Sequence, residues 1–267
     1  MSRPLIEIPT EEYDEYADYI TEDDEPVDNF FTEKQQYLLT RPLYCNWEHP
    51  ERTLLVCANV GIFSPLFGRK GIVPDVLLSM DVQIHDADIQ KTHRSYFVKR
   101  FGKVPDLVIE IVSLTPGGEE KEKKKKYALL GIPYYVIFDP LHQLHKEILT
   151  IYQLERGKYI PYIGSFFPSI GLGLRMWEGI YEDWPRPEHW LRWVDEHNQL
   201  IPTGDEQAQV ERTAKLFAQE HADQEKRRAD QERERADQEK ERADQEKERA
   251  ELLAAKLRKL GIDPSVL

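Results

Sequence analysis

The segment PDLVIEIVS, from Pro105 to Ser113, constrains the fold of this chain more than any other stretch. Read as a strand, it is apolar on both faces, and a strand covered on both sides is normally a near-continuous run of Val, Ile and Leu. Yet Glu110 shares one face with Val108 and Val112. Because a buried, ionised carboxylate is costly unless another group pairs with it, the segment predicts a sheet covered on both faces and a partner for Glu110.

Strand and helix patterns alternate along the middle of the chain. Strands are expected within residues 52–63, 72–84, 95–113, 133–140 and 169–184, and a hairpin is expected within residues 147–160. Helices are expected from Thr32 to about residue 44, within residues 115–133 and within residues 187–200. This alternation predicts an α/β domain with a mixed central sheet flanked by helices.

The charged residues divide the chain into three parts. Residues 1–30 carry eleven acids and one base, whereas residues 205–267 carry 17 acids and 14 bases. These two segments account for the whole formal charge of −13, so residues 31–204 are near neutral. We therefore expect an acidic N-terminal arm at 1–30, an α/β domain at 31–204 and a separate tail at 205–267. The charge of the domain neither favours nor excludes nucleic acid as a partner.

The cysteines and the hydropathy pattern exclude several classes of protein. Cys45 and Cys57 form none of the CxxC or Cys/His spacings of a zinc site, and two cysteines make no disulfide framework. The sequence shows no basic leader followed by an apolar run and no apolar span of about 20 residues. We expect a cytoplasmic protein that neither spans nor binds a membrane.

Residues 205–267 contain a seven-residue repeat. The unit ADQEKER and its variants place alanine in register at five positions (Ala222, Ala229, Ala236, Ala243 and Ala250). Gly and Pro are absent from residues 207–260, which predicts one charged helix of about 80 Å. A coiled coil requires apolar residues at both a and d, whereas this repeat supplies one alanine per heptad. A solvated single helix and an alanine-lined homo-oligomer both remain open, and the amphipathic segment at 250–264 is the best candidate for a contact.

Two carboxylates and a lysine-rich segment form the candidate site. VPDVLL places Asp75 at the entry of a strand, PDLVIEIV places Glu110 within the next strong strand, and EKEKKKKY follows on a helix about a dozen residues later. Carboxylates that project from neighbouring strands toward one point can hold Mg²⁺, which takes oxygen ligands. A nearby lysine can stabilise charge that develops on a phosphate. The set is typical of metal-assisted phosphodiester hydrolysis, and a metal would also keep Glu110 ionised.

The same segments resemble the Uma-two family, the restriction-endonuclease-like proteins of the PD-(D/E)XK superfamily. VPDVLL, PDLVIEIVSLTP and EKEKKKKYALLGIPYYVIFDP follow one another in the order of that family's motifs. The resemblance is strong over residues 72–140 and looser over residues 32–193, and the charged heptad tail is also similar to tails in the family. It implies an endonuclease-like fold, DNA as the substrate and Mg²⁺ as the cofactor, with Mn²⁺ as the alternative.

The resemblance also assigns roles to single residues. Asp75 matches the first metal-binding aspartate, and Glu110 matches the second metal-binding acid. The superfamily lysine stands two residues after that acid, where this chain has Val112. The family pattern instead has a lysine four residues before a tyrosine, so Lys123, ahead of Tyr127, takes the role of the catalytic lysine. The other lysines of the run leave this choice open by about one helical turn.

Structural roles remain open for the same acids. An aspartate such as Asp75 at a strand entry is also typical of an Asx turn, and Glu110 could form a structural ion pair with a lysine of the helix. Asp106 lies on the same face as Glu110 but about 13 Å away along an extended strand. We therefore expect Asp106 to face solvent at the strand mouth and not to share the metal.

The sequence as a whole predicts a Mg²⁺-dependent DNA endonuclease, in which Asp75 and Glu110 bind the metal and Lys123 stabilises the reacting phosphate. Two alternatives belong to other classes of protein. One is a catalytically lapsed nuclease fold that binds DNA or protein, which Val112 in the usual lysine position motivates. The other is a scaffold protein whose function lies in the tail.

Overall fold

The computed structural model describes residues 29–47, 52–67, 71–84, 95–113, 119–144 and 146–259. The chain divides into two compact units, the first ending at Asp205 and the second beginning at Glu206. The expected acidic arm lies almost wholly outside the described residues, as does the end of the amphipathic segment at 250–264.

A six-stranded mixed sheet forms the centre of the first unit, in the order β1-β3-β5-β6-β7-β8. Its strands are β1 (Leu54–Ala58), β3 (Val76–Met80), β5 (Leu107–Ile111), β6 (Tyr134–Phe138), β7 (Leu149–Glu155) and β8 (Lys158–Pro161). Strands β5 and β6 are parallel, and the other neighbours in the sheet are antiparallel. Parallel neighbours need a crossover, usually a helix, and here it contains the turn η3 (Glu119–Lys123) and helix α4 (Lys124–Leu130). The predicted mixed sheet is therefore confirmed.

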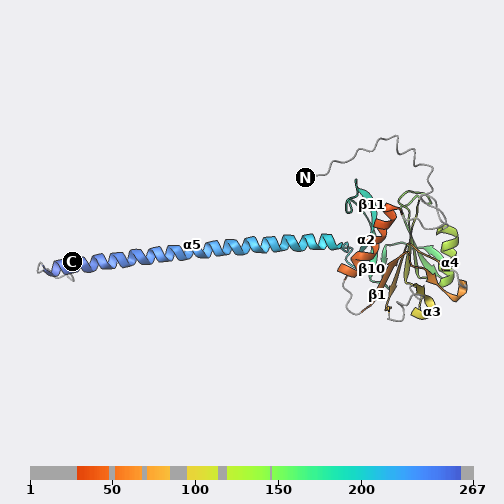
Figure 1. The fold of residues 1–267 in the computed structure, drawn as a ribbon, viewed down its shortest axis with the longest axis horizontal. Helices are drawn as coiled ribbons and strands as arrows, with labels where there is room; N and C mark the ends of the chain where they lie inside the picture. The colour runs from red at the N-terminus through yellow and green to blue at the C-terminus, as the bar shows by residue number, and fades with distance from the viewer. Residues whose placement is uncertain are drawn as a thin grey trace, which may run out of the picture. The chain divides into compact units, whose positions relative to one another are not determined.

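Both faces of this sheet are covered. Helix α2 (Phe30–Asn46) and a three-stranded sheet of β9 (Phe166–Phe167), β10 (Leu172–Gly179) and β11 (Glu188–Val194) pack on one face, and α4 packs on the other. Figure 1 shows α2 and α4 on opposite sides of the strands. On β5, Leu107, Ile109 and Ile111 belong to the core on the α2 side, whereas Val108 and Val112 belong to the core on the α4 side. The two-sided burial predicted for PDLVIEIVS is confirmed.

Short elements fill the connections between the long ones. They are β2 (Ile62–Phe63), η1 (Pro65–Phe67), β4 (Tyr96–Phe97) and α3 (Val98–Phe101), with β2 and β4 paired in parallel. The predicted hairpin is also present, since β7 and β8 pair across Arg156 and Gly157, both with positive φ.

Local chemistry sets the ends of the two helices that flank the sheet. Helix α2 begins two residues earlier than predicted, because Asn29 caps it: the Thr32 N–H donates to Asn29 Oδ1 at 2.9 Å. Helix α4 ends at Gly131 as predicted. Gly131 has a φ of 85°, a left-handed conformation that glycine adopts without strain, and the Gly131 N–H donates to the Tyr127 and Ala128 carbonyls.

The helix predicted for residues 187–200 is wrong, because the structure places strand β11 there. It pairs with β10 in antiparallel register, with Trp190 opposite Trp177 and Trp193 opposite Leu174. The Trp193 Nε1–H donates to the Leu39 carbonyl of α2 at 2.7 Å. Large side chains at positions 190, 191, 193 and 194 fit a helical spacing, but here both faces of the strand are buried, so the two-residue alternation of a strand is absent.

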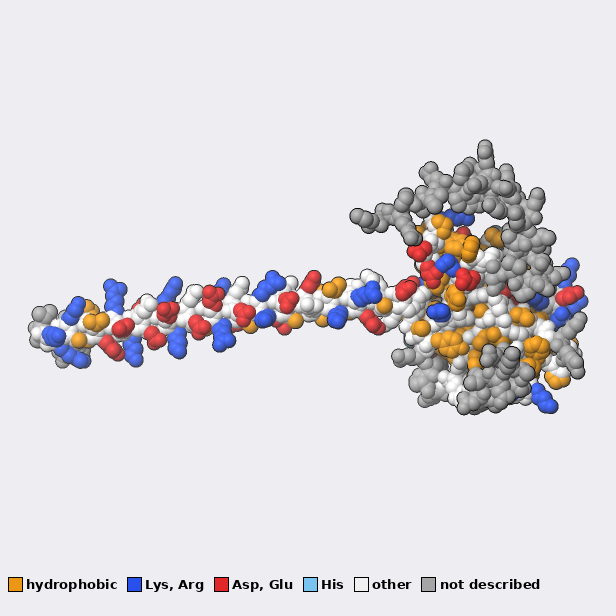
Figure 2. Space-filling model, in the orientation of Figure 1, with side chains coloured by type: hydrophobic (Ala, Val, Ile, Leu, Met, Phe, Trp, Pro, Cys, Tyr) orange, Lys and Arg blue, Asp and Glu red, His pale blue; other side chains and the backbone are white. Residues whose placement is uncertain are grey.

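The described residues of the second unit form a single helix, as part of α5 (Gly204–Lys259). Its described side chains are almost all exposed, and acidic and basic groups are interspersed along its length, as Figure 2 shows. The predicted long charged helix is therefore confirmed. Within the described residues, no helix combines the length and the apolar character needed to cross a membrane.

Candidate active site

Glu110 is buried near the end of β5, on the face that helix α4 covers. Its side chain is 1% exposed. Lys123 Nζ donates to Glu110 Oε2 at 2.8 Å, and the Tyr127 hydroxyl donates to Glu110 Oε1 at 2.5 Å. Each carboxylate oxygen therefore has a donor, and one of these donors is a cation. This arrangement supplies the partner that a buried carboxylate requires.

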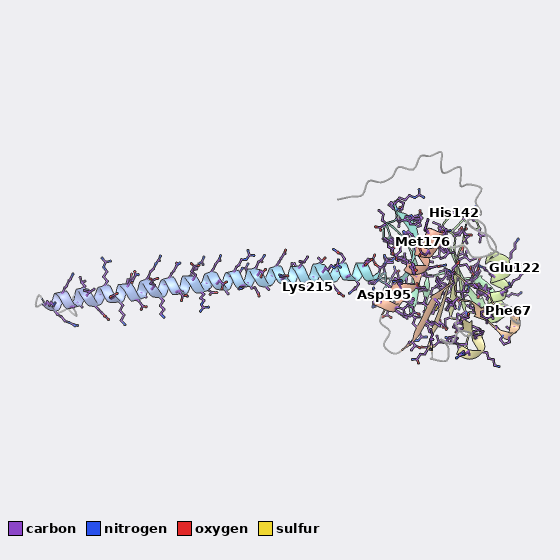
Figure 3. The ribbon with its side chains drawn as sticks, in the orientation of Figure 1. Phe67, Glu122, His142, Met176, Asp195 and Lys215 are labelled. Atoms are coloured by element: carbon purple, nitrogen blue, oxygen red, sulfur yellow. The ribbon has the colours of Figure 1, made fainter. Side chains whose placement is uncertain are left out.

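The two donors come from one side of the same helical segment. Lys123 ends the π-helical turn η3, and Tyr127 follows four residues later in α4, so both side chains point to the sheet. Lys123 reaches Glu110 from the surface and is 27% exposed, whereas Tyr127 is fully buried. Figure 3 labels Glu122, the exposed neighbour of Lys123, at the outer edge of this segment. The site is thus accessible from the Lys123 side and closed on the Tyr127 side.

Asp75 enters the site from the neighbouring strand. It directly precedes β3, and one step beyond the Val76–Ile109 pair of the antiparallel ladder it stands opposite Glu110. Its Oδ2 accepts the Ile111 N–H at 2.5 Å, so the carboxylate continues the ladder just before the first residue of β3. The charge of Asp75 also acts on Tyr127. The structure therefore brings Asp75, Glu110 and Lys123 together around one phenol.

Tyr127 is the member of this cluster that the sequence reasoning did not assign to the site. Burial, followed by the negative charge of Glu110, raises the pKa of the Tyr127 hydroxyl well above its usual value, and Asp75 adds to the effect. The phenol is therefore a neutral donor at physiological pH. The signal that could have identified it is its position four residues after Lys123, which places both side chains on one helix face.

Val112 stands two residues after Glu110 and is an apolar core residue. Val112 is 2% exposed and packs in the core between the sheet and α4. The superfamily lysine would stand at this position, but a valine there contributes only apolar contact. Of the lysines in the run, Lys121, Lys125 and Lys126 are exposed. Lys123 places its ammonium group on the Glu110 carboxylate.

The expectation that Asp106 faces solvent is wrong. Asp106 Oδ2 accepts the Met80 N–H at 2.7 Å and the Lys103 ammonium at 2.7 Å, and its side chain is 19% exposed. Asp106 thus continues the β3–β5 ladder at the end opposite to Asp75, because Met80 ends β3 as Ile111 ends β5. The two Pro-Asp pairs make equivalent cross-strand hydrogen bonds, but only Asp75 stands beside Glu110.

The donor set at this site is suited to one kind of metal. Among the described residues, no group of three or more His, Cys, Asp or Glu side chains is placed to hold a metal ion. Mg²⁺ is usually bound through one or two carboxylates, with water and substrate phosphate completing its six oxygen ligands. Asp75 and Glu110 would supply the two carboxylates of such a site.

The fold and this cluster define a class: a mixed α/β protein with a restriction-endonuclease-like architecture and an acidic site at the end of its central strands. The model of the Uma2 family, described as "Putative restriction endonuclease", matches residues 9–167, and the chain belongs to that family. No curated protein and no solved structure matches the chain.

Proposed function

We propose that this protein is a Mg²⁺-dependent DNA endonuclease that hydrolyses phosphodiester bonds, with Mn²⁺ as an alternative cofactor. One observation carries the proposal: a buried glutamate held between a lysine and a tyrosine, opposite an aspartate of the next strand. Membership in a family described as restriction endonuclease supports a nuclease-like function and a DNA substrate.

Each residue of the cluster has a role in this reaction. Asp75 and Glu110 would hold Mg²⁺, which lowers the pKa of a bound water and withdraws charge from the phosphate. The Lys123 ammonium, at the exposed side of the site, would stabilise the charge on the phosphate oxygens while the bond to water forms and the bond to the leaving oxygen breaks. Tyr127 would hold the Glu110 carboxylate from its buried side.

The test is plasmid nicking with Mg²⁺ by variants that keep the fold. Asp75→Asn keeps an oxygen that can accept the Ile111 N–H, and Glu110→Gln keeps an acceptor for the Tyr127 hydroxyl. We expect each to lower the nicking rate by at least about 100-fold, the loss typical of removing one electrostatic group from an active site.

Asp106→Asn is the matched control, because Asp106 makes the same cross-strand hydrogen bond as Asp75 at the other end of the ladder. It should retain the nicking rate of the parent. If Asp75→Asn and Glu110→Gln cut as fast as Asp106→Asn, the carboxylates are structural and the proposal is wrong.

A catalytically lapsed module that binds DNA or protein is the second candidate. Val112 in the lysine position and the protein donors on both oxygens of Glu110 favour it. Titration calorimetry separates the two functions: the endonuclease requires Mg²⁺ or Mn²⁺ binding that Glu110→Gln abolishes, whereas the lapsed module shows no such binding.

A further inference from the structure

A groove of about 480 Å³ lies beside the candidate active site, between α4 and the β7–β8 hairpin. Lys121, Lys124 and Lys125 line it from the helical segment, and Lys158 and Tyr159 line it from the hairpin. Figure 2 shows basic side chains at the edge of the first unit that carries α4. The catalytic proposal above makes no use of this groove.

The charge of the groove is of one sign. Four lysines line it, and within the described part of the chain no acid contributes to its lining. Lys121, Lys125 and Lys158 are exposed, whereas the Lys124 ammonium lies 3.4 Å from the centroid of the Tyr152 ring. The surrounding residues 31–204 are near neutral in sum. Four like charges around one concavity therefore form a local attraction for anions.

The hairpin wall of the groove is anchored to the core by a cluster of tyrosines behind it. Tyr135, Tyr152 and Tyr159 pack with ring centroids 5.5–6.4 Å apart, and the Tyr159 hydroxyl donates to the Ile132 carbonyl at 2.8 Å. These contacts fix the hairpin wall against the core, so the spacing between Lys158 and the helix lysines is set before a ligand binds. Preorganisation of this kind lowers the cost of binding.

The groove and the active site share one helical segment. Lys123 and Tyr127 point to Glu110, while Lys121, Lys124 and Lys125 lie on the side of the segment that faces β8. A polyanion that follows the groove would therefore pass within one helical turn of Lys123. A small anion would need only one or two of these lysines. Lysines on both the helical segment and the β7–β8 hairpin suit an extended chain of phosphates instead.

We propose that this groove binds the phosphate backbone of duplex DNA next to the position where the strand is cut. The choice of DNA rests on the proposed function, but the binding itself requires neither metal nor cleavage. The lysines make sequence-independent contacts that hold the strand, and they leave the chemistry to Asp75, Glu110 and Lys123.

The test is fluorescence anisotropy of a labelled DNA duplex with the full chain in EDTA, at several salt concentrations. Lys121→Gln, Lys125→Gln and Lys158→Gln are combined in one groove variant, and Lys124 is kept because it packs on Tyr152. The control combines Lys99→Gln, Lys126→Gln and Lys146→Gln, three lysines that are also exposed and do not line the groove. Circular dichroism confirms that both variants are folded.

We expect the slope of log K against log salt to become less negative in the groove variant by up to about 2.7, since each phosphate contact contributes about −0.9. The control should keep the parental slope. Equal slopes for the groove variant and the parent, or a parent that does not bind DNA, would overturn the inference. Tighter groove-dependent binding of an RNA duplex would overturn the choice of DNA.

Plasmid nicking separates this inference from the proposed function. A parent that binds DNA through the groove but does not cut it with Mg²⁺ leaves the groove intact and removes the endonuclease. If the parent cuts DNA but the groove variant binds with the parental slope, the endonuclease stands and the groove inference is wrong.

Discussion

At the scale of single residues, the central feature is a carboxylate buried to 1% exposure with two different donors. The ammonium of Lys123 balances the charge of Glu110, and the phenol of Tyr127 holds its other oxygen. Removing one partner of such a group is costly because the remaining charge loses part of its compensation. The two donors are not equivalent, since Lys123 is partly exposed and Tyr127 is fully buried.

Tyr127 is therefore expected to act as a positioning residue for Glu110. Tyr127→Phe keeps the ring in the core and removes one hydrogen bond to a charged group, so the free energy of unfolding should fall by about 1.5–3 kcal/mol. In nicking assays kcat should fall while KM stays near that of the parent. All five tryptophans lie before residue 205, so their fluorescence in urea reports on the first unit alone.

Tyr44→Phe is the control for this variant, because the Tyr44 hydroxyl donates to the Val56 carbonyl and accepts the Val56 N–H, far from Glu110 on the α2 side of the sheet. It should lose stability without losing kcat.

Tyr127 also predicts a pH dependence of stability. Its pKa is raised in the folded state, so its contribution to the free energy of unfolding is constant below about pH 10 and is lost as the pH rises further. An equal loss of stability of the parent and Tyr127→Phe above pH 10 would contradict this assignment.

Part of the site could be predicted from the sequence, and the limits have physical causes. Glu110 needed a partner because it stands between Val108 and Val112 in a buried strand, and that partner is present. Asp106 was misjudged because the group that it binds, the Met80 N–H at the end of β3, belongs to a different strand. The catalytic roles of Asp75, Glu110 and Lys123 stay predictions.

At the scale of elements, η3 and α4 present two distinct faces. The face toward the sheet carries Lys123 and Tyr127, and the face toward β8 carries the groove lysines.

Lys123→Ala is expected to lower the nicking rate by at least about 100-fold, because it removes the cation from the site. Lys126→Ala, which removes an exposed lysine of the same segment, should cut as the parent does. The reverse result would assign the catalytic role to another turn of the segment.

The central elements of the fold were predictable because their signals are local. The β7–β8 turn, the glycine that ends α4 and the two-sided apolar run of β5 each lie within a few residues. Strand β11 was predicted as a helix because its identity depends on pairing with β10 and on the contact of Trp193 with α2. Such long-range contacts can override a local pattern.

At the scale of the whole molecule, the chain combines residues 31–204, which are near neutral in sum, with a long helix rich in charges of both signs. High helix propensity favours α5 even without a second protein chain. Opposite charges four residues apart, such as Arg242 and Glu246, add about 0.2–0.5 kcal/mol per pair to its stability. Yet Leu252 and Leu253 are 57% and 62% exposed near its end. The alanine of each heptad and the leucine segment, Leu252 with Leu253, are therefore candidate contacts on α5.

We expect any self-association of the protein to depend on the leucine segment and to be weak, because one alanine per heptad is a poor coiled-coil seam. Light scattering should give the full chain a mass that rises with concentration, whereas a chain ending at residue 205 keeps the mass of one chain. Leu252→Gln with Leu253→Gln should behave as the shortened chain, and Ala229→Gln with Ala236→Gln should behave as the full one. If the shortened chain associates as the full chain does, α5 has no role in assembly and the first unit forms the contact.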